Sequence, residues 1–175
     1  MTEKKLTKEV AIVTGSDLGI GQATAIAFAR EGADVAVTYL EDKQGAEHTV
    51  QLIEAAGQKA VLVQLDQTQP ESGEQLFQAV KDKLGTPTVL VNNAATSSAS
   101  TSVKDMSFEN WDHAIKTNLY GPFFCCQQFL RAMDGSEKRG VIINITSVHE
   151  EIAHPGTADY CAAKGGLRNL TESWL

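Results

Sequence analysis

The chain of 175 residues lacks several features that mark large classes of proteins. It has no run of lysine and arginine, and its formal net charge is -7, which argues against a nucleic-acid partner. No apolar run approaches the roughly 18 residues that a membrane-spanning helix needs. The charged residues 1–9 lead directly into an apolar stretch, without the hydrophobic segment of a signal peptide. We therefore expect no membrane partner.

Cysteine is scarce as well. The three cysteines, Cys125, Cys126 and Cys161, form an odd set without the spacing of a metal site. Reduced cysteines in a cytoplasmic protein are the simplest interpretation, and we expect no metal. The chain also lacks the Gly-Lys-Ser/Thr triplet of a P-loop nucleoside triphosphatase, internal repeats and low-complexity linkers.

What is present is the composition of one globular domain, with 42% hydrophobic and 21% charged residues. Apolar runs predict five strands, and helical periodicity predicts a helix after each of them. The strands are expected over residues 10–14, 35–39, 60–65, 88–91 and 141–145, and the helices over 19–30, 44–56, from a capping box at 68–71 to Gly85, 107–133 and from Tyr160 onward. This alternation predicts a parallel sheet covered on both faces, a three-layer doubly wound α/β fold.

The end of the sequence departs from that fold. A doubly wound dinucleotide-binding domain has two βαβαβ halves and six strands. Here the first half is followed by only two further strands, and the sequence stops at Trp174-Leu175 within a predicted helix. We therefore expect residues 1–175 to form a single dinucleotide-binding domain that lacks its last strand or strands and has little or no turnover alone.

Tyr160 and Lys164 form a candidate proton-transfer pair. Residues four apart share one helix face, so both side chains can reach the same small volume. A cation within about 4–6 Å lowers the pKa of a tyrosine from its usual value of about 10. Tyr-x-x-x-Lys is therefore one way to build a general acid/base, although the same pair also occurs on ordinary solvated helices.

A glycine-rich turn joins the first strand to the first helix. Gly15 permits a tight turn, while Gly19 and Gly21 allow close approach of the backbone. The free N–H groups at the start of the helix can then bind a pyrophosphate. A strand before the turn and a helix after it favour nucleotide binding over simple loop closure.

The end of the second predicted strand bears on cofactor choice. Tyr39 ends this strand, and neither an acid for a ribose 2′-OH nor an arginine for a 2′-phosphate is found there. The nearby acids Glu41, Asp42 and Asp17 would repel a 2′-phosphate, which Lys43 partly opposes. The pattern weakly favours NAD over NADP. Asp66, after the third strand, is either an acceptor for an adenine amino group or a residue of the following helix start.

Five motifs extend these observations. They are Thr14-Gly15-x-x-x-Gly19-x-Gly21, Asn92-Asn93-Ala94-Ala95, Asn118-Leu119-x-Gly121, Ile145-Thr146-Ser147 and Tyr160-x-x-x-Lys164. In this order they resemble the short-chain dehydrogenase/reductase family along the whole chain. The resemblance implies a Rossmann-like fold and an NAD(P)-dependent oxidoreductase acting on a secondary alcohol or carbonyl. The alternative is a truncated family member that binds nucleotide, or associates with other subunits, without turnover.

The resemblance also implies roles for individual residues. Tyr160 would be the general acid/base, and Lys164 would lower its pKa and bind the nicotinamide ribose. Ser147 would hold the substrate oxygen, and Asn118 would support a proton-relay water. The cofactor site would be lined by Gly15, Ser16, Asp17, Leu18, Gly19, Ile20, Gly21, Tyr39, Asp66, Gln67, Asn93, Ala94 and Ala95 together with Tyr160 and Lys164. Ala95 stands where the family usually has glycine.

Two further expectations concern the substrate and the partner. Ser147-Val148-His149-Glu150-Glu151 resembles a loop of glucose 1-dehydrogenases, so His149 is a candidate contact for a substrate hydroxyl, including that of a sugar such as glucose. Ser97 stands where those enzymes carry a glutamate. The helices near 108–133 and 158–175 would form a subunit interface, which predicts a homo-oligomer. Pro122 lacks an N–H for the Asn118 carbonyl, so a kink there would free that carbonyl for a water or for Lys164.

Overall fold

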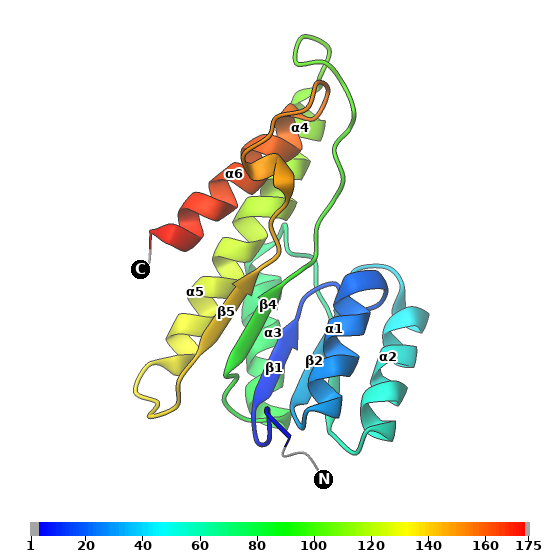
Figure 1. The fold of residues 1–175 in the computed structure, drawn as a ribbon, viewed down its shortest axis with the longest axis vertical. Helices are drawn as coiled ribbons and strands as arrows, with labels where there is room; N and C mark the ends of the chain where they lie inside the picture. The colour runs from blue at the N-terminus through cyan, green and yellow to red at the C-terminus, as the bar shows by residue number, and fades with distance from the viewer. Residues whose placement is uncertain (1–3, 174–175) are drawn as a thin grey trace.

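The computed structural model describes residues 4–173 and contains one parallel sheet (Figure 1). Its strands are β1 (Val10–Val13), β2 (Asp34–Tyr39), β3 (Ala60–Gln64), β4 (Val89–Asn92) and β5 (Val141–Asn144). They lie in the order β3-β2-β1-β4-β5, and each neighbouring pair is parallel. The chain thus reverses its direction across the sheet between β3 and β4, which creates a crevice at the carboxyl ends of β1 and β4. The predicted doubly wound fold is confirmed.

Helices cover both faces of this sheet. They are α1 (Gly19–Arg30), α2 (Lys43–Ala55), α3 (Pro70–Lys83), α4 (Phe108–Ile115), α5 (Gly121–Met133) and α6 (Ala158–Glu172), with short helices η1 (Lys116–Tyr120) and η2 (Val148–Glu150). Alternate residues of each strand point to opposite faces. Ala11 and Val13 pack with α1 and α2, while Val10 and Ile12 pack with α3 and α5. The result is the predicted three-layer α/β/α arrangement.

The helix expected over 107–133 is interrupted in its middle. Residues Lys116–Tyr120 form a π-helical turn, in which the N–H of Gly121 donates to the carbonyl of Lys116 five residues earlier. Pro122 has no N–H and crowds the preceding turn, which accounts for the widened helix at this point. The distortion falls at Asn118, where a kink was predicted. α6 packs against both α4 and this turn.

Two further predictions concern the residues at which helices begin. Ser107 caps α4 as expected, because its hydroxyl accepts from the N–H of Asn110 at 3.1 Å. The capping box predicted at residues 68–71 is wrong. Thr68 directs both its N–H and its hydroxyl to the carboxylate of Asp66, at 2.9 and 2.7 Å. Asp66 is the nearer and charged acceptor, so α3 begins at Pro70 without a side-chain cap.

β5 is an incompletely covered strand. It pairs with β4 on one side, and residues 4–173 provide no strand on the other. Val141 and Ile143 are 51% and 39% exposed, so the face of β5 that continues the α1/α2 layer is bare. In Figure 1, β5 forms the edge of the sheet beside α5. Within the same residues, no helix combines the length and the apolar character needed to cross a bilayer.

Candidate functional site

A cavity of about 660 Å³ lies at the carboxyl ends of the first four strands. Its wall combines the glycine-rich turn, the ends of β2, β3 and β4, and one face of α4 and η1. The lining residues are Gly15, Asp17, Leu18, Gly19, Ile20, Thr38, Tyr39, Leu40, Leu65, Asp66, Gln67, Thr68, Asn93, Ala94, Ala95, Thr96, His113 and Thr117. Most of the predicted cofactor residues therefore surround one space.

The glycine-rich turn owes its shape to backbone conformation. Gly15 and Gly19 have φ of +60° and +59°, in the left-handed region that other residues rarely adopt. A Cβ on Gly21 would lie 2.1 Å from the Gly15 carbonyl oxygen, so only glycine lets α1 pack against the turn. No side chain caps the start of α1, and its first turn carries no acid. The free N–H groups there are consequently available to an anion.

Two of the predicted cofactor residues brace the turn instead of lining the cavity. The buried hydroxyl of Ser16 donates to the Val13 carbonyl at 2.8 Å and accepts from the N–H of Thr38 at 3.0 Å. Gly21 is likewise buried behind the turn. Asn93 does border the cavity, but its amide donates to the carbonyls of Thr14 and Gly15, each at 2.9 Å. The side chains of Ser16 and Asn93 thus fix the glycine-rich turn in place.

The end of the cavity near β2 is acidic. Burial raises the pKa of Asp17, and the neighbouring Asp42 carboxylate raises it further. Asp42 caps α2 by accepting from the N–H of Gly45 at 2.9 Å. Lys43, the nearby cation, forms an ion pair with Glu47 at 3.4 Å on the surface of α2. The negative charge of Asp17 and Asp42 is therefore not balanced by Lys43.

Gln67 connects the opposite wall. Its amide nitrogen donates to the carbonyls of Ala94 and Thr117, at 2.9 and 2.8 Å. Its carbonyl oxygen Oε1 is buried and has no hydrogen-bond partner in the part of the chain that the structure describes. A buried acceptor that borders a cavity and lacks a donor is a position where a ligand N–H or O–H fits.

His113 and Thr117 also line the cavity, and the sequence analysis did not identify them. They lie four residues apart across the junction of α4 and η1, on the face that meets the loop after β4. Their spacing places them on one helical face, next to Asn118 in the sequence. That spacing was the available signal, but nothing in the sequence showed that this helical face points toward the glycine-rich turn.

A second group of predicted residues lies at the carboxyl end of β5. Lys164 Nζ is 5.7 Å from the centroid of the Tyr160 ring and donates to the Ile145 carbonyl at 2.7 Å. The His149 ring meets the Tyr160 ring edge to face, with centroids 6.1 Å apart. Ser147 Oγ accepts from the N–H of His149 at 3.2 Å. Residues from β5, the following loop and α6 are thus brought together.

Lys164 is 3% exposed, which is unusual for a lysine. Burial lowers its pKa to about 8, and the charge of Glu150 acts in the opposite direction. Of the two partners expected for the Asn118 backbone carbonyl, a water or Lys164, the lysine does not bond it within residues 4–173. The ammonium donates to Ile145 instead, because α6 lies over the end of β5.

Asn118 is fully buried and contacts the loop after β4. Its carbonyl Oδ1 accepts from the N–H of Thr96 at 2.8 Å, and its Nδ2 donates to the Thr96 carbonyl at 3.0 Å. Further along the same loop, the carboxylate of Asp159 accepts from the Ser98 hydroxyl at 2.6 Å and from the N–H of Ala99 at 3.1 Å. The loop therefore links the cavity to the start of α6.

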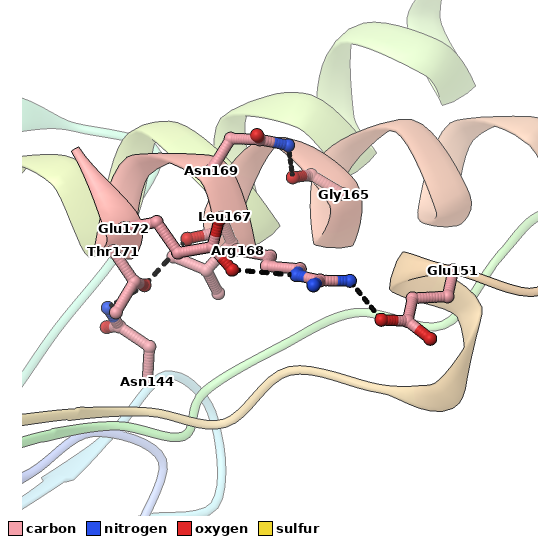
Figure 2. Close-up of polar contacts among 8 residues, drawn as sticks. All are labelled: Asn144, Glu151, Gly165, Leu167, Arg168, Asn169, Thr171 and Glu172. Carbon is pink, nitrogen blue, oxygen red and sulfur yellow. Dashed lines mark hydrogen bonds and ion pairs between the residues drawn. The ribbon is translucent and has the colours of Figure 1, made fainter.

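The far half of α6 is tied to β5 and to the loop that follows it (Figure 2). Asn144 donates to the Thr171 hydroxyl at 2.8 Å and accepts from Asn92 Nδ2 at 2.8 Å. Figure 2 also shows Arg168 between Glu151 and Glu172, with ion pairs to both. The exposed ion pairs add little stability. The partly buried Asn144–Thr171 bond sets how α6 lies along β5.

The two groups of residues are adjacent but do not share one enclosed space. Tyr160, Lys164 and Ser147 are not among the residues that line the 660 Å³ cavity. The loop of residues 93–101 lies between the cavity and the start of α6. The arrangement can hold a nucleotide in the cavity and present a half-buried Tyr160 with a buried Lys164 next to it. Among residues 4–173 there is no cluster of side chains suited to a metal ion.

Comparisons with known proteins identify dehydrogenases that are similar to this chain. The chain is 36% identical to glucose 1-dehydrogenase 2 of Bacillus subtilis, over 97% of the chain and 66% of that protein. It is 40% identical to 3beta-hydroxysteroid dehydrogenase 1 of Eggerthella lenta, over 96% of the chain and 64% of that protein. The crystal structure of acetoin dehydrogenase from Salmonella typhimurium superposes with a TM-score of 0.90 at 38% identity, covering 94% of this chain and 65% of that one.

The chain thus spans about two thirds of the length of these relatives. A family model described as short chain dehydrogenase matches residues 9–175. With the glycine-rich turn, the Tyr160/Lys164 pair and the parallel sheet in place, the chain belongs to the short-chain dehydrogenase family.

Proposed function

We propose that this chain carries the nucleotide site and the proton-transfer residues of an NAD(P)-dependent oxidoreductase acting on a secondary alcohol or carbonyl. The observation that carries the proposal is the pairing of Tyr160 with a buried Lys164 beside the carboxyl end of β5. A lysine is rarely buried unless it is paired, and a cation near a phenol favours the phenolate. Family membership supports the same reaction class.

The cavity fits a nicotinamide dinucleotide. The turn from Gly15 to Gly19 and the uncapped start of α1 would hold the diphosphate. Apart from its chain neighbours and its own helix backbone, nothing in residues 4–173 lies within 4 Å of a Cβ built on Gly19, so the space in front of the turn is open. Gln67 Oε1 offers an acceptor that no donor in the described part of the chain uses. The bound nicotinamide would supply the hydride donor or acceptor.

The residues of the chain would manage the proton. Tyr160 would transfer it to or from the substrate oxygen, assisted by Lys164. Ser147 Oγ accepts from the N–H of His149, so its own hydrogen remains free to be donated to that oxygen. We propose that Asn118 holds Thr96 in place. A second proposed role, based on the family, is the support of a relay water.

The substrate proposal rests on the tautomer of His149. Its Nδ1 lies 2.9 Å from the Ile152 carbonyl, which can only accept, so Nδ1 carries the hydrogen in the neutral ring. The other nitrogen, Nε2, then presents a lone pair that suits a hydroxyl donor. We propose that His149 contacts a hydroxyl of the substrate, which favours a polyhydroxy compound, including a sugar such as glucose.

For the cofactor we propose NAD over NADP. Support comes from the unbalanced charge of Asp17 and Asp42 at the β2 end of the cavity. A 2′-phosphate carries about -1.5 to -2 charge at neutral pH and would be repelled there. The ion pair of Lys43 with Glu47 leaves that repulsion in place.

A second candidate function is nucleotide binding without turnover. The cavity is formed by residues up to Thr117, whereas the proton-transfer residues lie beside β5, which has a partly uncovered face. Catalysis is sensitive to small displacements: about 1 Å can cost on the order of 10²-fold in rate. Binding of the adenine and diphosphate end tolerates such displacements better.

We also propose that two copies of the chain associate. An apolar groove of about 620 Å³ runs between α5 and α6, lined by Leu119, Tyr120, Phe123, Phe124, Gly166, Asn169 and Leu170. No charged residue lines it, although the chain carries a net charge of -7. An identical groove on a second copy is the partner of matching chemistry. The three unpaired cysteines support the further proposal of a reducing, cytoplasmic location.

One experiment separates the two functions. Binding of NAD and of NADP to the 175-residue chain is measured by calorimetry, and turnover is assayed with each nucleotide on a panel of sugars and secondary alcohols. Binding with turnover supports the oxidoreductase, and binding alone supports the second candidate. If neither nucleotide binds at millimolar concentration, both functions are excluded for this chain.

A further inference from the structure

Glu150 stands out among the charged residues near Tyr160. It ends η2, the short helix that packs directly against α6. Its carboxylate oxygen Oε2 is buried and has no hydrogen-bond partner within residues 4–173. The carbonyl oxygen of Glu150 lies 3.5 Å from a Cβ built on Gly165, the residue that follows Lys164. A carboxylate in such a position needs a nearby cation or donor.

Lys164 is the buried cation of the facing helix, whereas Arg168 on the same helix pairs with Glu151 and Glu172. The Lys164 ammonium has three hydrogens, and the described residues supply one acceptor, the Ile145 carbonyl. Burial disfavours its charged form, while the charge of Glu150 favours it. The two groups are thus coupled without forming a direct ion pair among residues 4–173.

We propose that Glu150 is a positioning residue that keeps Lys164 charged and directed toward Tyr160. This inference rests on the proposed function, because it specifies how the proton-transfer pair is maintained. A neutral Lys164 could neither stabilise a Tyr160 phenolate nor retain its attraction for a nucleotide phosphate or ribose oxygen. Without Glu150, burial alone would act on the ammonium.

Several other charged groups around α6 are already engaged, among them Asp112 of α4, which pairs with Lys116 at 2.7 Å. Asp159 accepts hydrogen bonds from Ser98 and Ala99. Glu151 and Glu172 both pair with Arg168 on the outer side of α6. His149 contacts the Ile152 carbonyl and the Tyr160 ring. His154 hydrogen-bonds to the Pro155 carbonyl and faces the His149 ring. Glu150 is therefore the carboxylate to test.

The direct test measures the protonation of Lys164 in the complete 175-residue chain. Lysine labelled with ¹³C at Cε is incorporated, the Lys164 signal is assigned with Lys164→Met, and its shift is followed by NMR against pH. Glu150→Gln keeps the shape of the side chain and removes the charge. We expect the pKa of Lys164 to fall from about 8 by roughly half a pH unit or more in this variant.

Glu151→Gln is the matched control. It removes the neighbouring charge, which is exposed and paired with Arg168, and should leave the Lys164 titration nearly unchanged. Glu150→Asp retains the charge and should restore part of the wild-type value, which a purely structural role would not require. A Lys164 titration in Glu150→Gln that matches wild type, or lies above it, overturns the inference.

This measurement uses neither cofactor nor substrate, so its failure is separate from that of the proposed function. If Tyr160→Phe retains full turnover, the proposed function fails even when Glu150 controls Lys164. If the chain has catalytic activity, kcat is also measured against pH. The alkaline limb of this profile should move to lower pH in Glu150→Gln and stay in place in Glu151→Gln.

Discussion

The side-chain amide of Asn118 forms two hydrogen bonds with the backbone of Thr96, one to its N–H at 2.8 Å and one to its carbonyl at 3.0 Å. A neighbouring strand would satisfy Thr96 in the same way. Asn118 is fully buried in the π-helical turn, so the loop after β4 is held by a helix where the sheet has ended.

This pairing predicts a clear cost for Asn118→Asp. The carboxylate still accepts from the Thr96 N–H but can no longer donate to the carbonyl, and the two oxygens then repel each other. We expect a loss of about 2–3 kcal/mol in the free energy of unfolding, measured with urea. Asn169→Ala, which removes an exposed bond within α6, is the control and should cost well under 1 kcal/mol. Equal stabilities for the two variants would contradict this interpretation.

Tyr160→Phe should abolish turnover while nucleotide affinity changes little. The substitution removes the hydroxyl that transfers the proton, and general acid/base catalysis contributes about 10²–10⁴-fold. Lys164→Ala should reduce both turnover and affinity, because it also removes the ribose contact. Steady-state rates and calorimetry distinguish the two variants. Tyr120→Phe, in the apolar groove, is the control, and substantial turnover by Tyr160→Phe would refute the mechanism.

Lys164→Met should stabilise the chain near neutral pH. The folded-state pKa of Lys164 is lowered from 10.5 to about 8, so the unfolded state binds more protons between these values. Burial of the charge therefore costs stability below pH 8, and the cost fades as pH rises to 10.5. We expect a gain of at most about 3 kcal/mol at pH 7, less the lost bond to Ile145. Urea unfolding at several pH values measures this gain in stability, with the exposed Lys138→Met as control. A gain that grows with pH would contradict the expected cost of burying the Lys164 charge.

Asp17→Asn should narrow the preference for NAD. It removes the carboxylate beside the expected 2′ position, so NADP affinity should rise by a few fold while NAD affinity stays constant, as measured by calorimetry. Because the pKa of Asp17 is raised, lowering the pH should protonate it and weaken the preference in wild type. The 2′-phosphate also titrates near pH 6, so the difference between wild type and Asp17→Asn isolates Asp17. Tighter NADP binding by wild type at neutral pH would exclude the proposed preference.

Phe123→Glu should separate associated copies. The side chain lines the apolar groove between α5 and α6 and is 39% exposed in the single chain. A carboxylate there would be buried against its counterpart in a second copy. Light scattering after size-exclusion chromatography should show a lower mass than wild type at equal concentration. Val103→Glu alters an exposed apolar residue outside the groove and should leave the mass unchanged. A monomeric wild type would remove the basis for this expectation.

Local patterns predicted the architecture well, since strand runs and helix periodicity depend on neighbouring residues. The five strands, the cap at Ser107 and the disturbance near Pro122 followed from such patterns. Contacts between segments that are far apart in the sequence could not be predicted from such patterns. The Gln67 bridge to Ala94 and Thr117, and the partner of Lys164, depend on how loops meet at the sheet edge.

The same limit applies to the cavity. Ser16 is next to Gly15 in the sequence, yet its hydroxyl is committed to β1 and β2. His113 lies far from the glycine-rich turn in the sequence, yet lines the same cavity. A motif identifies which segment forms the wall, but the packing of the sheet decides which side chains face inward.

The burial of Lys164 has a consequence for laboratory evolution. A screen that rewards heat resistance alone would favour replacement of this lysine by an apolar residue, because the folded chain gains when the buried charge is lost. Libraries selected on melting temperature would then drift toward inert proteins. Selection for a more heat-stable variant of this chain needs a second assay, run at the same time, whose result depends on the Lys164 ammonium group.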